Sequence, residues 1–304
     1  MRIVFMGTPE FACPSLSALS KSHDVVRVVT RPDAVRGRGK RLEPSPVKAL
    51  AGELGLAVTE ASRMTPEVMD ELCAAKADLC VVAAYGCILP DELLEMFPLG
   101  CVNVHASLLP RWRGAAPIQR AVLEGDELAG ASIMRVVHEL DAGAYCAQVS
   151  TTVAGKTSSE LLDELGHLGA EVLVEAIGRI ADGTAVWTEQ DESLVTYAHK
   201  IEKAEMRLDP ADGALANVRR VLASTDAAPA RCEVAGKGVR LMRAMTCDDA
   251  VAAGEVLVSY GRVALGCADG ALEVLDVKPD GKREMQASAW AAGLRADHLA
   301  WGRI

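Results

Sequence analysis

Short apolar runs, which are typical of buried strands, alternate with helical patterns through the first half of this chain. The first run, 2–6, ends at a Gly-Thr-Pro turn, and helical spacing follows over 10–21. Further strand-like runs at 25–30, 79–84 and 101–105 are also separated by helix-like segments. Parallel strands need such crossover connections, so the pattern predicts a mostly parallel α/β sheet with helices on both of its faces.

The pattern changes in the last third of the chain. A helical segment at 215–223 is followed by short strand-like segments with glycine-containing turns between them. Strands that recur about every ten residues favour a small β-barrel or sandwich. The strand-like segments are 239–242, 255–258, 263–265 and 272–275.

The charge is unevenly distributed along the chain. The net charge of −10 argues at first against a nucleic-acid partner. The acidic excess lies within 1–205, however, because the rest of the chain holds 13 basic and 13 acidic residues. Inside the acidic part, residues 31–48 hold six Lys and Arg residues against two acidic ones. Prolines and glycines in this basic stretch predict a loop, which is either a solvated charged surface or a site for an anionic partner.

Several classes of protein are excluded by what the sequence lacks. The longest apolar run, 79–85, is far shorter than the ~20 residues of a membrane-spanning helix. Nine cysteines without a Cys-x-x-Cys pair indicate neither a disulfide framework nor a zinc site, so we expect no bound metal. The first residues enter a strand directly, without a leader pattern, which predicts a cytoplasmic protein. The glycine fingerprints of dinucleotide and ATP sites are also missing.

The segment that follows the apolar strand 101–105 is the best candidate for chemistry. Ligands of open parallel sheets bind at the carboxyl ends of strands, and alternation places Asn103 and His105 on one face there. An amide and an imidazole side by side at a strand end can supply a hydrogen-bond donor and a titrating acid or base. Asp141, in a later turn, could accept from His105 and fix its tautomer. From the residues alone, a structural Asn-x-His pair and an ordinary Asp turn remain open alternatives.

Six motifs occur in order and carry a resemblance to a known family. The longest is a 17-residue string at 103–119, Asn-Val-His-x-Ser-Leu-Leu-Pro-Arg-Trp-Arg-Gly-Ala-Ala-Pro-Ile-Gln. Together they resemble the methionyl-tRNA formyltransferase family, densely over 1–205 and thinly after it. The other five are Met-Gly-Thr-Pro-Glu-Phe at 6–11, Gly-Arg-Gly-Lys at 37–40, Pro-Ser-Pro-Val-Lys at 44–48, Ala-Tyr-Gly-x-Ile-Leu-Pro at 84–90 and Leu-Asp-x-Gly at 140–143.

The resemblance implies an enzyme that moves the formyl group of 10-formyltetrahydrofolate to the α-amino group of methionyl-initiator tRNA for translation initiation. The folate is then a co-substrate, and no metal is involved. The family's catalytic residues carry over to Asn103, His105 and Asp141. Its folate site carries over to Ser107, Leu108, Leu109 and Pro110, with Tyr85 and Gly86 nearby. Its tRNA-contacting loop carries over to Arg36, Arg38, Lys40, Arg41 and Lys48.

The same resemblance implies the domain organisation. We expect a Rossmann-like formyltransferase domain over 1–187, a linker over 188–206, and an oligonucleotide-binding (OB-like) barrel over 207–304 that also touches tRNA. One active site per chain favours a monomer, with no membrane partner. The chain departs from the family at Ala106, where many relatives have Gly, and at 224–230 before the barrel. The second domain is also neutral rather than basic. These features concern how the second domain contacts tRNA, and they leave the expected reaction unchanged.

Two other functions are considered. Another folate-dependent formyltransferase, acting on a nucleotide-sugar amine or glycinamide ribonucleotide, shares the three catalytic residues but needs no basic loop. A non-catalytic RNA-binding protein keeps the two domains but needs no intact triad, and it would function normally as a His105→Ala variant.

Overall fold

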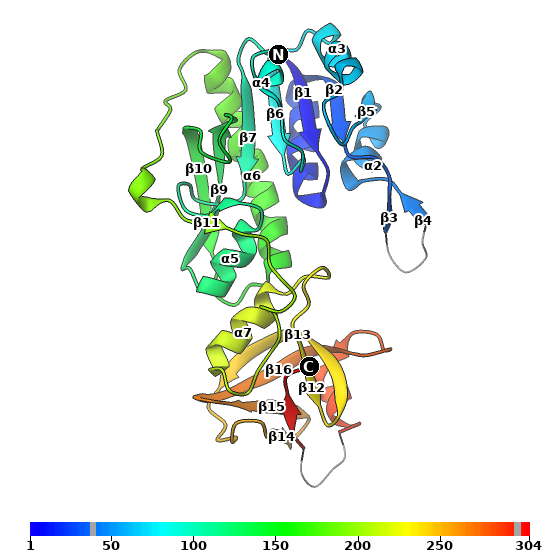
Figure 1. Cartoon of the computed structure of the whole chain (residues 1–304), viewed down its shortest axis with the longest axis vertical. Coiled ribbons are helices and arrows are strands. Elements are labelled where there is room, and N and C mark those ends of the chain that lie inside the picture. The colour runs from blue at the N-terminus through cyan, green and yellow to red at the C-terminus, as the bar shows by residue number, and fades with distance from the viewer. Residues whose placement is uncertain (37–40, 295–298) are drawn as a thin grey trace. The chain divides into compact units, whose positions relative to one another are not determined.

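The chain divides into two compact units. The computed structural model describes residues 1–36, 41–294 and 299–304 (Figure 1). Unit 1 comprises Met1–Gly114, Ala129–Thr151 and Leu162–Ala198, and unit 2 comprises Ala115–Leu128, Thr152–Leu161 and His199–Ile304. The domain boundaries expected at 187 and 207 remain a prediction. No helix within the described ranges is both long enough and apolar enough to cross a membrane.

A seven-stranded sheet forms the centre of unit 1, in the order β10-β9-β7-β6-β1-β2-β5. The neighbours from β7 to β5 pair in parallel, whereas β9 runs antiparallel to β7. The predicted mostly parallel sheet is therefore confirmed. Its strands are β1 (Arg2–Gly7), β2 (Asp24–Thr30), β5 (Val58–Glu60), β6 (Leu79–Ala83), β7 (Cys101–His105), β9 (Leu128–Arg135) and β10 (Tyr145–Thr152).

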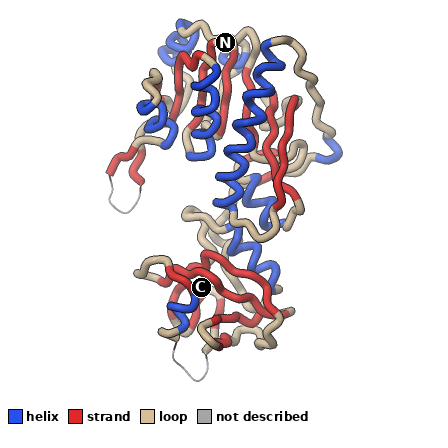
Figure 2. The backbone as a smooth tube through the Cα atoms, turned by 180° about the vertical axis from the view of Figure 1, so that it is seen from behind, coloured by secondary structure: helices blue, strands red, loops and turns tan. Residues whose placement is uncertain are grey.

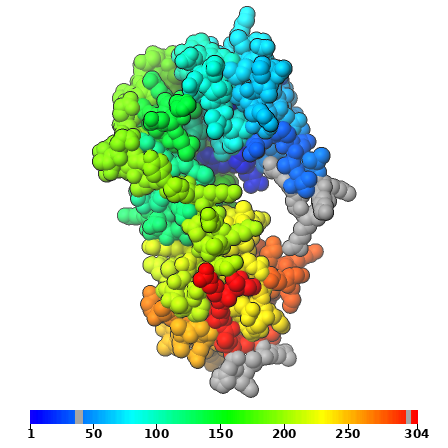
Figure 3. Space-filling model, viewed as in Figure 1, coloured from blue at the N-terminus to red at the C-terminus, as the bar shows by residue number. Residues whose placement is uncertain are grey.

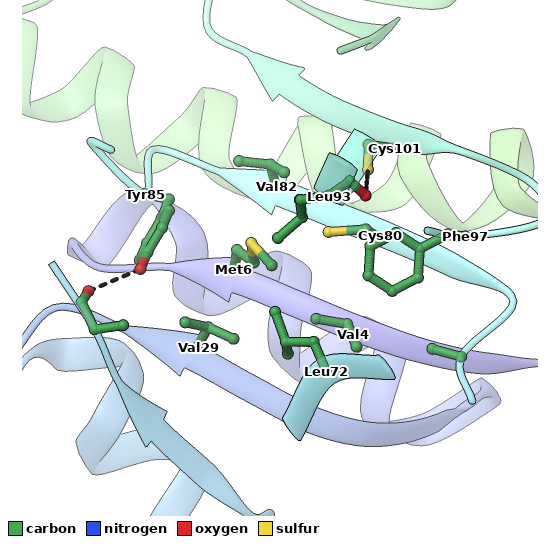
Figure 4. Close-up of a cluster of buried hydrophobic side chains, with 12 residues drawn as sticks. Val4, Met6, Val29, Leu72, Cys80, Val82, Tyr85, Leu93, Phe97 and Cys101 are labelled. Carbon is green, nitrogen blue, oxygen red and sulfur yellow. Dashed lines mark hydrogen bonds between the residues drawn. The ribbon is translucent and has the colours of Figure 1, made fainter. Parts of the chain in front are cut away.

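Helices cover both faces of this sheet, as the alternation predicts. On one face, α3 (Pro66–Ala74) and α4 (Asp91–Leu94) contribute Leu72 and Leu93 to a buried apolar cluster (Figure 4). On the other face lies α6 (Ser158–Ala181), seen in front of the sheet in Figure 2. This helix packs closely against strand β7, because a Cβ added at Gly169 would lie 3.0 Å from Val104 Cγ1. The remaining helices before α6 are η1 (Glu10–Ala12), α1 (Cys13–Ser22), α2 (Pro46–Glu53) and α5 (Pro117–Glu124).

The strand order indicates where on the sheet a ligand is expected to bind. The chain runs outward from β1 through β2 to β5, then returns to β6 and β7 on the other side of β1. The reversal makes β1 and β6 the switch point, beside whose carboxyl ends ligands of such sheets bind. The loops after these two strands are joined there, since Thr8 Oγ1 donates to the Tyr85 carbonyl at 3.1 Å.

The basic stretch folds differently from the predicted loop. It contains β3 (Ala34–Arg36) and β4 (Arg41–Glu43), which pair antiparallel and project from the unit as a hairpin (Figure 1). The prediction of a loop was wrong for these residues, because its proline signals, Pro32 and Pro44, lie just outside the two strands.

Unit 2 contains the antiparallel barrel. Its strands run in the order β14-β15-β16-β13-β12-β18, with β17 paired to β16. A bridge between Glu255 and Ala300 nearly closes the sheet, which confirms a barrel and excludes the sandwich. Helix α7 (Ala214–Ala223) and four strands match predicted segments, namely β13 (Lys237–Cys247), β14 (Val256–Ser259), β15 (Arg262–Cys267) and β16 (Gly270–Pro279). The sequence patterns missed β12 (Arg231–Val234), β17 (Met285–Gln286), α8 (Ala287–Ala291) and β18 (Trp301–Gly302).

Candidate active site

His105 ends strand β7 with its imidazole buried, and both ring nitrogens face a defined neighbour. Nε2 lies 2.9 Å from the carbonyl oxygen of Trp112. A carbonyl oxygen can only accept a hydrogen bond, so Nε2 must carry a hydrogen. In the neutral imidazole, Nδ1 is therefore the nitrogen without a hydrogen. The other nitrogen, Nδ1, lies 3.6 Å from Oδ2 of Asp141, whose side chain is also largely buried. Any proton that the imidazole gains therefore enters at Nδ1, next to a carboxylate.

Asp141 is held in an unusual conformation. Its φ is +50°, in the left-handed region that residues other than glycine rarely adopt. Its Oδ2 also accepts a hydrogen bond from the Gly114 amide at 2.9 Å. Trp112, which supplies the carbonyl for His105, has a φ of +66°. Backbone strain of this kind persists only where the surroundings impose it, and it is concentrated at functional sites.

Asn103 lies one strand repeat before His105, on the same face of β7. It is the register partner of Val82 on β6 and of Met134 on β9, so it sits within the sheet rather than at a free edge. Its side chain is partly exposed, and no hydrogen bond to it occurs within the described ranges of the chain. The amide is thus available to a ligand. The structure brings together the predicted His105 and Asp141. Asn103 lies two residues before His105 on β7, and no contact joins it to either residue in the described part of the chain.

The turn Ser107–Pro110 is fixed by two residues that the sequence analysis missed. Ser132 Oγ donates to the Ser107 carbonyl at 2.6 Å and accepts from the Leu109 amide at 3.2 Å. Gln148 Nε2 donates to the Leu109 carbonyl and to Ser132 Oγ, each at 2.9 Å. Ser132 is the register partner of His105, so the strand pairing alone could have pointed to it.

The same contacts limit what the turn can offer to a ligand. The side chains of Ser107 and Leu109 are buried, and Leu108 packs against Gly130, where an added Cβ would lie 2.4 Å from Leu108 Cδ2. The backbone groups described above are already bonded inside the protein. Pro110, which is partly exposed, leaves an apolar wall as the main surface of this turn.

Tyr85 and Gly86 follow the end of β6. The Tyr85 ring is buried in the apolar cluster, and its hydroxyl donates to the Ala61 carbonyl at 2.7 Å (Figure 4). Burial raises the pKa of this phenol, so the hydroxyl stays neutral. Only the backbone of Tyr85 and Gly86 reaches the switch point, where Gly86 has a φ of +78°.

The basic residues expected to contact tRNA fall into three groups. Arg36 and Arg41 are register partners at the end of the β3–β4 hairpin. Arg38 and Lys40 lie outside the described residues. Lys48, on α2, forms ion pairs with Asp33 at 2.7 Å and Glu60 at 3.0 Å. The hydrogen bond to Asp33, followed by that to Glu60, raises the pKa of Lys48, and its charge is compensated within the unit.

Across residues 1–36, 41–294 and 299–304, no three His, Cys, Asp or Glu side chains gather as a metal site.

Comparisons with known proteins agree on one family. A sequence profile described as "Formyl transferase" matches residues 1–177, and one described as "Formyl transferase, C-terminal domain" matches 200–295. The chain is 46% identical to a methionyl-tRNA formyltransferase of Methylococcus capsulatus (strain Bath) over 309 residues, covering 100% of this chain and 99% of the relative. It is 40% identical to a methionyl-tRNA formyltransferase of Paracoccus denitrificans, covering 97% of this chain and 98% of the relative.

Solved structures share the fold at lower identity. HypX from Aquifex aeolicus, in complex with tetrahydrofolic acid, matches with a TM-score of 0.66 at 19% identity. The match covers 99% of this chain and 50% of HypX, so this chain spans about half of that protein. At this identity the similarity concerns the fold alone.

Proposed function

The chain belongs to the methionyl-tRNA formyltransferase family, and we propose that Asn103, His105 and Asp141 carry out its reaction. The enzyme transfers the formyl group of 10-formyltetrahydrofolate to the α-amino group of methionyl-initiator tRNA. The product is the N-formylmethionyl-tRNA that begins translation. The observation that carries the assignment of residues is the pairing of His105 Nδ1 with Asp141 while Nε2 is held by the Trp112 carbonyl.

The proposed chemistry begins with attack by the neutral amine on the formyl carbon. The new C–N bond creates a tetrahedral oxyanion, to which the Asn103 amide donates. His105 then accepts the proton of the attacking nitrogen at Nδ1, where Asp141 stabilises the resulting imidazolium. The same proton passes to N10 of the folate as the bond between the formyl carbon and N10 breaks. Tetrahydrofolate leaves, and His105 returns to its starting tautomer.

The folate is proposed to bind at the carboxyl ends of β6 and β7. The wall at Pro110 suits a flat ring system, and the backbone at Tyr85 and Gly86 offers polar groups at the switch point. Ser132 and Gln148 keep the wall in place rather than contact the ligand.

The tRNA is proposed to meet the β3–β4 hairpin, through Arg36, Arg41 and the adjoining Arg38 and Lys40. Lys48 instead anchors the base of the hairpin, because two carboxylates already hold its ammonium group. The barrel of unit 2 is proposed as a second contact. We further propose that the enzyme acts as a monomer in the cytoplasm.

Transfer of labelled formyl to methionyl-initiator tRNA and methionyl-elongator tRNA, offered in parallel, tests the function. We expect transfer to the initiator alone. Failure with both tRNAs, while the protein still binds folate, would contradict the tRNA assignment and direct the search to small amines. A His105→Asn variant that binds tRNA normally but transfers no formyl group supports the proposed residues, and a fully active variant would refute them.

A further inference from the structure

The segment that follows α6 runs back across unit 1 and reaches the active-site residues. It includes η2 (Glu192–Leu194) and β11 (Tyr197–Ala198), the latter paired in parallel with β8 (Arg113–Gly114). Figure 3 shows this yellow-green segment on the surface of the unit. One of its side chains, Gln190, is nevertheless buried, with 8% of its surface exposed.

Gln190 uses its whole amide inside the protein. Nε2 donates to the backbone carbonyls of Asp141 and Gly143, each at 2.8 Å. Oε1 accepts from Arg113 Nε at 2.9 Å. A single side chain therefore holds the backbone on both sides of Ala142, in the turn where Asp141 has its left-handed φ. This turn has no room to shift towards β9, since a Cβ added at Gly143 would lie 2.1 Å from the Arg135 carbonyl oxygen.

Arg113 fixes Gln190 in turn. Its side chain is almost completely buried, and its Nη2 also forms an ion pair with Glu192 at 2.7 Å. A buried guanidinium must be paired, and Gln190 and Glu192 supply partners for it.

Three consecutive residues, Trp112 and the two residues of β8, each support the site. The Trp112 carbonyl accepts from His105, the Arg113 side chain donates to Gln190, and the Gly114 amide donates to Asp141.

The segment that follows α6 also holds Trp112, whose carbonyl oxygen bonds to His105. Thr196 Oγ1 accepts from the Trp112 amide at 2.9 Å, and the Thr196 carbonyl accepts from the Arg113 amide at 2.9 Å. The contacts close a ring that runs from His105 through Trp112, Arg113, Gln190 and Asp141 back to His105.

We propose that Gln190, held by Arg113, is a positioning residue for formyl transfer, because it sets the backbone from which Asp141 faces His105. Gln190 touches neither reactant in this proposal and acts only through Asp141. The inference rests on the proposed catalytic roles of Asp141 and His105.

The decisive variant is Gln190→Glu. It keeps the length of the side chain and the acceptor for Arg113, and it replaces the two N–H donors by an oxygen that repels the carbonyls of Asp141 and Gly143. We expect kcat to fall about tenfold to hundredfold, as for a misplacement of about 1 Å, with the KM values for both substrates changed less than about twofold. Glu189→Gln is the matched control, because the neighbouring side chain is exposed and makes none of these contacts; it should leave kcat unchanged.

A double-mutant cycle separates positioning from general damage. If Gln190 acts through Asp141, adding Gln190→Glu to Asp141→Asn should lower kcat less than about twofold further. A full multiplicative loss in the Asp141→Asn background, or an unchanged kcat in the single variant, would overturn the proposal. Gln190→Met, which keeps the volume and removes every hydrogen bond, serves where Gln190→Glu does not fold.

A structural readout distinguishes failure of this inference from failure of the proposed function. Amide hydrogen exchange at 139–144 should quicken in Gln190→Glu relative to Glu189→Gln, whatever the substrate is. Quicker exchange without any formyl transfer by the unsubstituted protein would contradict the function and leave the structural part standing. Unchanged exchange would refute the positioning role directly.

Discussion

Nδ1 of His105 lies 3.6 Å from Oδ2 of Asp141, and the same carboxylate oxygen accepts the Gly114 amide hydrogen. The separation exceeds that of an ordinary hydrogen bond, so the neutral imidazole and the carboxylate are neighbours rather than bonded partners. A proton on Nδ1 would add a hydrogen-bond donor and a positive charge facing the Asp141 carboxylate. In the proposed mechanism, the carboxylate therefore stands beside the nitrogen that receives the proton of the attacking amine, so it interacts with the transition state more strongly than with the ground state.

Removing the Asn103 amide should slow the chemical step. We expect Asn103→Ala to lower kcat by about 10²–10³, because one oxyanion donor is lost, and to leave KM nearly unchanged. The isosteric Asn103→Asp, which replaces a donor by a negative charge, should lose at least as much. Steady-state formyl transfer checks both variants, and a defect confined to KM would show that Asn103 only binds substrate.

Asp141→Asn tests the charge of the carboxylate separately from its shape. The amide oxygen can still accept from Gly114, while the partner for a protonated His105 is lost. We expect kcat to fall by roughly 10²-fold, with the melting temperature changed by only a few degrees. Rapid-quench measurement of a single turnover gives the rate of chemistry directly. Normal single-turnover rates in a stable variant would exclude Asp141 from the mechanism.

Substitutions of Arg41 in the β3–β4 hairpin and of Lys48 on α2 should affect the salt dependence of tRNA binding differently. Each lost phosphate contact reduces the slope of log Kd against log salt concentration by roughly 0.7–0.9. We expect Arg41→Ala to reduce the slope for tRNA by about this amount. Lys48→Ala should leave it unchanged, since Asp33 and Glu60 already neutralise Lys48. Fluorescence titration of labelled tRNA at several salt concentrations measures both, and equal slopes for the two variants would contradict the assignment.

Gly114→Ala should destabilise unit 1 and weaken catalysis together. Gly114 has a φ of +121°, and an added Cβ would lie 2.9 Å from the Ala198 carbonyl oxygen. We expect a loss of about 2–3 kcal/mol from strain and overlap. Gly183→Ala is the control, since Gly183 also has a positive φ of +70° but no atom within 4 Å of an added Cβ. It should lose only ~1 kcal/mol, and an equal loss in both variants by chemical denaturation would rule out the overlap.

The cysteines should differ in their reactivity towards iodoacetamide. The thiolate is the nucleophile, so a raised pKa suppresses alkylation at pH 8. Burial raises the pKa of Cys232 to about 12, and burial is also the main cause that raises the pKa of Cys267 to about 11. Cys73 is exposed. Mass spectrometry of the native protein should find Cys73 alkylated first and Cys232 only after unfolding, and early modification of Cys232 would contradict its burial.

Much of the candidate site was predictable because it lies on regular elements. Asn103 and His105 share a face of β7 through simple alternation, and the carboxyl end of a parallel strand is where ligands bind. Gln190 could not be found in the same way. It lies in a polar segment without periodicity, and its role depends on contacts to Arg113, Asp141 and Gly143, all distant from it in sequence.

The amino-acid pattern by itself determined the parallel sheet, the barrel segments and the residues that can do the chemistry, because strand and helix periodicities and side-chain types are local properties. Only the tertiary structure decided the tautomer of His105, the approach of Asp141 and the inward orientation of Gln190. It also showed that Lys48 is neutralised within the protein and that the Tyr85 ring belongs to the core. Hydrogen bonds and ion pairs between distant segments set these properties, and such contacts form only when the chain has folded.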